Sequence, residues 1–125
     1  MATVLYVDDE ETIGRVVSRY FTRRHDVVYV AKSVAEAQEI LKSADPTVVF
    51  LDVWLGGESG FDLLNWIEEY RPHLASRVTF VTGELSDIGR PGREWPPLGR
   101  EVIHKPFDLK TLADAVQRAE NDGGQ

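Results

Sequence analysis

Four carboxylates in a row follow a short apolar run near the beginning of the chain. Together they read LYVDDEE (residues 5–11), and the acids are Asp8, Asp9, Glu10 and Glu11. Adjacent like charges repel, and a buried carboxylate is unstable unless a partner neutralises it. Another acid, Asp52, directly follows a second apolar run, TVVFL (47–51). Oxygen ligands without His or Cys favour Mg²⁺, so we predict a magnesium site where these two segments meet.

Two further side chains of suitable chemistry follow apolar runs. Thr82 comes directly after VTFV (78–81), and Lys105 comes two residues after EVI (101–103). A threonine hydroxyl donates a hydrogen bond, and a lysine ammonium is a point charge suited to phosphoryl oxygens. A nucleophilic carboxylate, a divalent cation, a hydroxyl and a lysine are the groups that phosphoryl transfer requires, because that reaction depends on positioning and charge neutralisation.

The chain alternates between strand and helix patterns. Short β-branched runs predict five strands, at residues 3–7, 27–30, 47–51, 78–81 and 101–103. Apolar residues at helical spacing predict four helices that turn these side chains to the sheet: Ile13, Val16, Val17, Tyr20 and Phe21; Ala37, Ile40, Leu41 and Ala44; Phe61, Leu63, Leu64, Ile67 and Tyr70; Leu109, Leu112, Ala113 and Val116. Ser33 with Glu36 predicts a capping box, and Pro46 and Pro72 predict helix ends.

This alternation predicts an α/β fold, a doubly wound five-stranded parallel sheet with helices on both faces. The common flavodoxin-like order of five such strands, numbered along the chain, is 2-1-3-4-5. That order brings the ends of the first and third strands side by side. Asp8, Asp9 and Asp52 are therefore expected to converge, with Thr82 and Lys105 beside them.

Composition narrows the classes of function. With 42% apolar residues the 125-residue chain fits one packed domain, expected over residues 1–121, with 122–125 as a flexible tail or the start of a linker. A net charge of −7 argues against nucleic-acid binding by this domain, although a separate DNA-binding domain in a longer protein stays open. The absence of cysteine excludes disulfides and thiolate chemistry. Neither a membrane span nor a signal peptide is evident, so a cytoplasmic location is expected.

Taken alone, each candidate residue has an ordinary explanation. The acids after the first strand suit a helix N-terminus, because the helix dipole favours negative charge there. Asp52 can cap the next helix, Thr82 can simply end a strand, and Lys105 can be a loop lysine. The joint pattern favours a functional site, because four strand ends each supply a group that the chemistry needs, while the remaining strand, at the sheet edge, supplies none.

The segments LYVDDEE, VVFLDVWLGGESGFDLL, FVTGE and HKPF resemble, in order and over nearly the whole chain, the receiver domain of two-component response regulators. The resemblance implies that Asp52 accepts a phosphoryl group and that Asp9 binds Mg²⁺ directly and Asp8 through water. It also implies that the Trp54 carbonyl is a metal ligand, and that Thr82 and Lys105 contact the phosphoryl oxygens. The Lys105–Pro106 bond is expected to be cis, as in that family. The implied partner is a histidine kinase or histidine phosphotransfer protein.

Two features depart from the family pattern. The position three residues before Lys105 is usually aromatic and is Val102 here, which puts the usual threonine–aromatic switch in doubt. The segment GELSDIGRPGREWPPLGR (83–100), where the fourth helix belongs, contains three prolines and four glycines and has no apolar stripe of helical period. Because Pro and Gly destabilise helix interiors, we predict that this helix is missing or degraded.

Other functions compete with the receiver. A small-molecule hydrolase with an aspartyl-phosphate intermediate would resemble D-x-D at the nucleophile, whereas Asp52-Val53-Trp54 lacks the second acid. An adapter that binds partners independently of phosphorylation usually lacks a site residue, and all five are present. GGESG lacks the Lys-Ser/Thr ending of a P-loop. We therefore expect a phosphorylation-switched signalling domain that promotes only its own phosphorylation and dephosphorylation and is otherwise no enzyme. The oligomeric state is left open.

Overall fold

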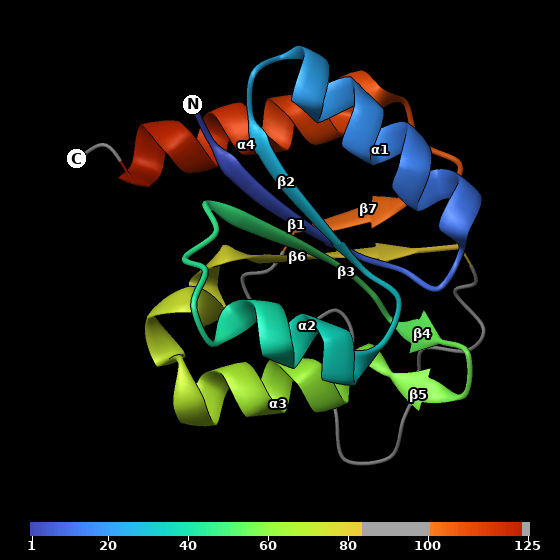
Figure 1. Cartoon of the computed structure of the whole chain (residues 1–125), viewed down its shortest axis with the longest axis vertical. Coiled ribbons are helices and arrows are strands. Elements are labelled where there is room, and N and C mark those ends of the chain that lie inside the picture. The colour runs from blue at the N-terminus through green and yellow to red at the C-terminus, as the bar shows by residue number, and fades with distance from the viewer. Residues whose placement is uncertain (84–100, 124–125) are drawn as a thin grey trace.

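Five parallel strands form the sheet at the centre of the molecule, in the order β2-β1-β3-β6-β7 (Figure 1). They are β1 (Thr3–Val7), β2 (Val27–Ala31), β3 (Val48–Asp52), β6 (Val78–Thr82) and β7 (Val102–His104). The computed structural model describes residues 1–83 and 101–123. Because β2 is an edge strand and β1 lies next to β3, the predicted order of the five strands is confirmed.

Helices cover the sheet on both sides. α1 (Glu11–Arg23) and α4 (Leu109–Gly123) lie on one face, and α2 (Val34–Leu41) and α3 (Gly60–Tyr70) lie on the other (Figure 1). A 3₁₀ helix, Pro72–Arg77, connects α3 to β6. Successive β1 side chains point to opposite faces, so Leu5 and Val7 join the core under α2 and α3, whereas Val4 and Tyr6 join the core under α1 and α4.

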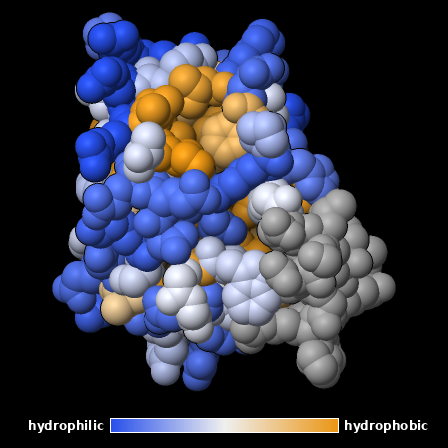
Figure 2. Space-filling model, turned by 90° about the vertical axis from the view of Figure 1, so that its right-hand side faces the viewer, coloured by the Kyte–Doolittle hydropathy of each residue, from blue (hydrophilic) through white to orange (hydrophobic). Residues whose placement is uncertain are grey.

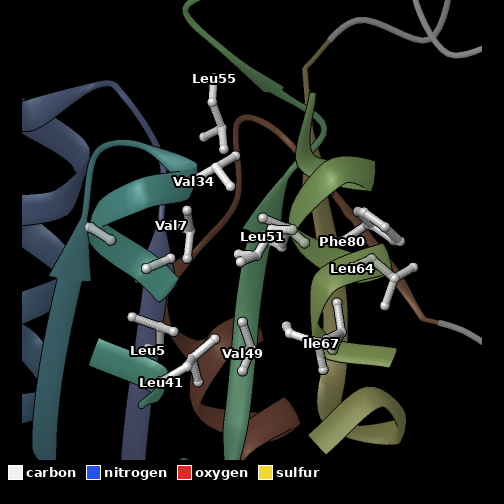
Figure 3. Close-up of a cluster of buried hydrophobic side chains, with 14 of the residues drawn as sticks. Leu5, Val7, Val34, Leu41, Val49, Leu51, Leu55, Leu64, Ile67 and Phe80 are labelled. Atoms are coloured by element: carbon white, nitrogen blue, oxygen red, sulfur yellow. The ribbon is translucent and has the colours of Figure 1, made fainter. Parts of the chain in front are cut away.

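The core under α2 and α3 holds the neighbouring strands β3 and β6 in place (Figure 3). Figure 3 shows side chains of β1, β3 and β6 meeting those of the two helices, among them Leu51 of β3 and Leu64 of α3. Every residue of β3 and of β6 is buried, as expected for strands covered on both faces. The ends of these strands are thereby held in fixed register, and the polar residues that end them are held with them.

Several predicted helix details are wrong. Val16 is 48% exposed and Tyr70 is 61% exposed, although both were assigned to apolar faces. Val17 and Phe21 occupy the buried side of α1, and Val16 is turned away by one helical step of about 100°. α2 ends at Leu41, well before Pro46, where the chain turns toward β3. α4 runs to Gly123, and the expected domain boundary at residue 121 stays a prediction.

A small hairpin after β3 is absent from the sequence prediction. β4 (Trp54–Leu55) pairs in antiparallel fashion with β5 (Glu58–Ser59), and Figure 1 shows it at the edge of the molecule where β3 ends. The two residues between them, Gly56 and Gly57, have φ values of 50° and 96°. Two successive positive φ angles define the type I′ turn that suits a two-residue hairpin, and glycine adopts them without strain. Residues 56–59 of GGESG are therefore the turn and second strand of a hairpin, and Gly60 is the first residue of α3.

The predicted loss of the fourth helix concerns residues that the structure does not describe. That expectation rests on 83–100, of which 84–100 lie outside the described ranges, as do 124–125. Among residues 1–83 and 101–123, no helix combines the length and apolar character needed to cross a membrane.

Candidate phosphoryl-transfer site

Lys105 lies at the centre of the acidic residues that end the strands. Its Nζ lies 2.8 Å from Asp8 Oδ2, 2.8 Å from Asp52 Oδ2 and 3.2 Å from Glu10 Oε1. The Lys105–Pro106 peptide bond is cis, as expected. β7 follows β6 in the sheet, and the Lys105 backbone N–H donates to the carbonyl of Thr82 at 2.8 Å. Residues distant in sequence thus meet at the carboxyl ends of four neighbouring strands.

The Asp8 carboxylate is fully buried and is held by three donors. Its Oδ2 accepts from the hydroxyl of Tyr6 at 2.8 Å and from Lys105, and its Oδ1 accepts from the backbone N–H of Glu10 at 3.0 Å. The Tyr6 ring is itself fixed in the core by Phe50 and Phe107. Burial and the negative charge of Asp8 raise the pKa of Tyr6 far above its usual range, so the hydroxyl remains a donor.

Asp52 is fixed at the end of β3 by its own loop and by Lys105. Its Oδ1 accepts from the backbone N–H of Trp54 at 3.2 Å, and its Oδ2 contacts Lys105. Gly60, the first residue of α3, packs so closely that a Cβ there would lie 2.2 Å from the Asp52 carbonyl oxygen. The Gly60 N–H donates to Val53 at 2.7 Å, so the start of α3 is held against the strand end.

The electrostatics of the site depend on burial and on the positive charge of Lys105. Burial raises the pKa of Asp52 to about 6, although the hydrogen bond and charge of Lys105 act in the opposite direction and Asp8 adds to the rise. For Lys105, burial alone would favour the neutral amine. Its hydrogen bonds to Asp52 and Asp8 outweigh that cost and raise the pKa of Lys105. The lysine is therefore a permanent cation held between two buried carboxylates.

Three carboxylates lie close enough together to hold a divalent cation. Asp8, Asp9 and Asp52 each offer an oxygen, and these oxygens lie within 4.8 Å of one another. Asp9 is exposed, and Gly56 of the hairpin leaves room for it, since a Cβ at that glycine would lie 3.0 Å from Asp9 Oδ2. Hard oxygen donors with no sulfur or imidazole fit Mg²⁺.

The remaining predicted residues take different positions. Thr82 is buried at the end of β6, one residue after the strand partner of Asp52, and is thus beside the acids. The Trp54 side chain packs partly buried against the core under α2 and α3. Val102 is half-buried and packs against the same core.

Sequence reasoning missed three contributors to this site, namely Tyr6, Glu10 as a partner of Lys105, and Gly60. The apolar run 3–7 predicted a buried strand that contains Tyr6 but did not indicate that the Tyr6 hydroxyl reaches Asp8. Its position two residues before Asp8, on the same side of the strand, was the available signal. Gly60, placed immediately before an apolar helix pattern, was read only as part of a loop.

Comparison with known proteins agrees with this geometry. A profile of the response regulator receiver domain matches residues 4–117. The chain belongs to the response regulator receiver domain family. Phosphorylation-switched signalling is the general role of such domains, and their usual partners are histidine kinases or phosphotransfer proteins.

Individual relatives of this receiver domain are moderately similar in sequence. The sensory transduction protein LytT of Enterococcus faecalis is 29% identical over 126 residues, covering 98% of this chain and 49% of that protein. The heme response regulator HssR of Staphylococcus saprophyticus is 35% identical over 114 residues, covering 90% and 48%. The NtrX receiver domain of Brucella abortus is 27% identical with a TM-score of 0.73, covering 94% and 98%. The chain thus spans about half the length of the two curated relatives LytT and HssR.

Proposed function

We propose that this receiver accepts a phosphoryl group onto Asp52 from the phosphohistidine of a histidine kinase or histidine phosphotransfer protein, with Mg²⁺ as its cofactor. The observation that carries the proposal is the Lys105 ammonium held 2.8 Å from both Asp8 and Asp52, beside Asp9. An ion pair of Lys105 with a purely structural role would need only one buried carboxylate. Three converging carboxylates with one lysine leave excess negative charge that a divalent cation neutralises.

The transfer step uses Asp52 as the nucleophile. A carboxylate oxygen of Asp52 forms a bond to phosphorus while the bond from phosphorus to the imidazole nitrogen breaks, and the bonding electron pair returns to that nitrogen. Mg²⁺ supplies neutralisation of the phosphoryl oxygens. Lys105 contributes a second positive charge, and the Thr82 hydroxyl, buried beside it, contributes a neutral donor. The roles of these side chains are positioning and electrostatic stabilisation.

The metal ligands we propose are Asp9, Asp52 and the carbonyl of Trp54. Asp8 is proposed to act through water, because its two oxygens already accept from three protein donors, whereas those of Asp52 accept from two. Its role is then to orient metal-bound water and to hold Lys105. This division follows from the number of lone pairs that each carboxylate has left.

The partner is proposed to bind in the layer of α1 and α4. Figure 2 looks onto the side of the molecule where the strands end and shows an apolar patch in that layer, bordered by hydrophilic residues. On α1, Val16 is exposed and Ile13 half-buried, and after β7 Phe107 is half-buried. Apolar groups next to a polar reaction site suit a transient protein partner. The apolar patch would contribute binding affinity, and the phosphohistidine of the partner would react at the neighbouring acids.

Intact mass after incubation with acetyl phosphate and Mg²⁺ tests the proposal. The wild-type chain is expected to gain one phosphoryl mass, and Asp52→Asn is expected to gain none. EDTA and Asp9→Ala are both expected to abolish labelling. A folded wild-type chain that is never labelled, or an Asp52→Asn variant labelled as fully as the wild type, would overturn it. The first result would favour the alternative of an adapter that works without phosphorylation.

A further inference from the structure

The third contact of Lys105 is with an acid that the chemistry above does not use. An ammonium group has three protons, and Lys105 directs them to Asp8, Asp52 and Glu10. All three donors of Lys105 are therefore occupied. A phosphoryl oxygen on Asp52 can receive a proton from Lys105 only if one of these contacts is given up.

We propose that Glu10 is a positioning residue that holds the Lys105 ammonium in the unphosphorylated protein and is displaced by a phosphoryl oxygen. The inference rests on the proposed function, since it concerns the same lysine. It assigns to Glu10 a restraining role, so that the wild-type residue slows the reaction of small phosphodonors.

Of the three carboxylates, Glu10 is the easiest for Lys105 to release. Its contact is the longest, at 3.2 Å, and its side chain is 58% exposed, whereas the Asp8 and Asp52 side chains are buried. A released Glu10 carboxylate is rehydrated, and exposed ion pairs contribute little stability. Releasing Asp8 or Asp52 instead would leave a buried carboxylate without its cation, which is strongly unfavourable.

Asp8 is also fixed independently of Lys105. The Tyr6 hydroxyl and the Glu10 backbone N–H hold both of its oxygens. The Glu10 backbone thus stays in place through its bond to Asp8 while its side chain is free to swing out. One residue therefore combines a fixed main chain with a displaceable carboxylate.

Two variants separate the contact from the charge. Glu10→Gln keeps the length of the side chain but removes its charge, and a neutral amide holds an ammonium more weakly. Glu10→Asp keeps the charge but is one methylene too short for the 3.2 Å contact. The matched control is Glu11→Gln, which removes the same charge from the next residue, whose carboxylate pairs with Lys32 and Arg15 and not with Lys105.

The first measurement is the initial rate of Asp52 labelling against acetyl phosphate concentration at saturating Mg²⁺. Both Glu10 variants are expected to lower the half-saturating phosphodonor concentration by roughly 1.5- to five-fold, the range that corresponds to one weak ion pair at the surface. Glu11→Gln is expected to match the wild type. If Glu10→Asp behaves as the wild type while Glu10→Gln is faster, charge alone is responsible and the proposed contact is refuted. Unchanged rates in both variants refute it too.

The second measurement needs no reaction. Proton exchange at the Lys105 ammonium, followed by ¹⁵N NMR in the metal-free protein, is expected to be faster in both Glu10 variants than in the wild type and in Glu11→Gln. Equal exchange in all four proteins would overturn the contact. This readout also separates the two proposals: a wild type that is never labelled refutes the phosphoryl acceptor, whereas labelling with unchanged Glu10 variants refutes only the inference about Glu10.

Discussion

Gly60→Ala is expected to destabilise the fold and to displace the phosphoacceptor loop. The added Cβ would lie 2.2 Å from the Asp52 carbonyl oxygen and 3.3 Å from Leu51 Cγ, and Cβ contacts essentially never fall below 3.0 Å. The main chain must therefore separate by about 0.8 Å, and the 2.7 Å bond from Gly60 to Val53 opposes that movement. Overpacking against a rigid element costs about 1–3 kcal/mol. Because the Asp52 main chain cannot rotate away as a side chain can, we expect the free energy of unfolding to fall by about 3 kcal/mol.

Gly83→Ala is the matched control for this substitution. A Cβ at Gly83 would make only ordinary contacts with Lys105, at 3.7 Å from its Cβ and 3.8 Å from its Cδ. Its effect on the free energy of unfolding is expected to stay within about 0.5 kcal/mol. Urea denaturation of both variants at one pH measures the difference, and an unchanged m-value would confirm that the native state is the one affected. Equal stability of Gly60→Ala and Gly83→Ala would refute the close packing of α3 against β3.

Three further substitutions test other parts of the structure. Tyr6→Phe removes only the hydroxyl that donates to buried Asp8, so urea denaturation should show a loss of about 1.5–3 kcal/mol. Asp52 has a pKa raised from 3.8 to about 6, so its ionised form destabilises the metal-free fold above pH 6, and that cost disappears as the pH falls toward 4. Asp52→Asn should therefore be more stable than wild type by about 1–3 kcal/mol at pH 7, with the gap closing near pH 4; a gap that widened at low pH would contradict this. Arg71→Ala removes donors to the Leu41 carbonyl and to Asp45, so the same assay should show a loss of about 1–2 kcal/mol in the free energy of unfolding. Lys42→Ala, which breaks an exposed ion pair with Glu39, is the control and should lose less than about 0.5 kcal/mol.

The sheet was predictable because its inner strands β1, β3 and β6 are covered on both faces. Runs such as residues 3–7 carry no polar face, and that pattern depends only on local sequence. Each predicted strand of the sheet lies within one residue of its observed bounds. Helix faces were less predictable, because Val16 and Tyr70 differ from buried neighbours only in direction, which depends on the exact phase of the helix against the sheet. The hairpin at Gly56 and Gly57 is only two residues per strand, too short for periodicity to indicate.

The convergence of the acids was predictable from topology, but their hydrogen bonds were not. Parallel strands that are neighbours in the sheet bring Asp8 and Asp52 to one edge whatever their side-chain conformations. Which proton goes to which oxygen depends on side-chain reach across the core, as for Tyr6 and Lys105. The Trp54 indole packs against the core under α2 and α3, a contact that the position of Trp54 two residues after Asp52 did not indicate.

The number of charges explains why acids end a buried strand. Among residues 1–83 and 101–123, Asp8, Asp9, Glu10 and Asp52 meet one cation, Lys105, so these four carboxylates and one ammonium have a formal charge of −3. Desolvation makes that excess unfavourable, as the raised pKa of Asp52 indicates. A divalent cation lowers the charge to −1 and a proton on Asp52 lowers it only to −2, so the metal is the better neutralising partner. The same excess that destabilises the metal-free fold is therefore the source of its affinity for Mg²⁺, and stability and metal affinity are expected to change in opposite directions when one of these acids is neutralised.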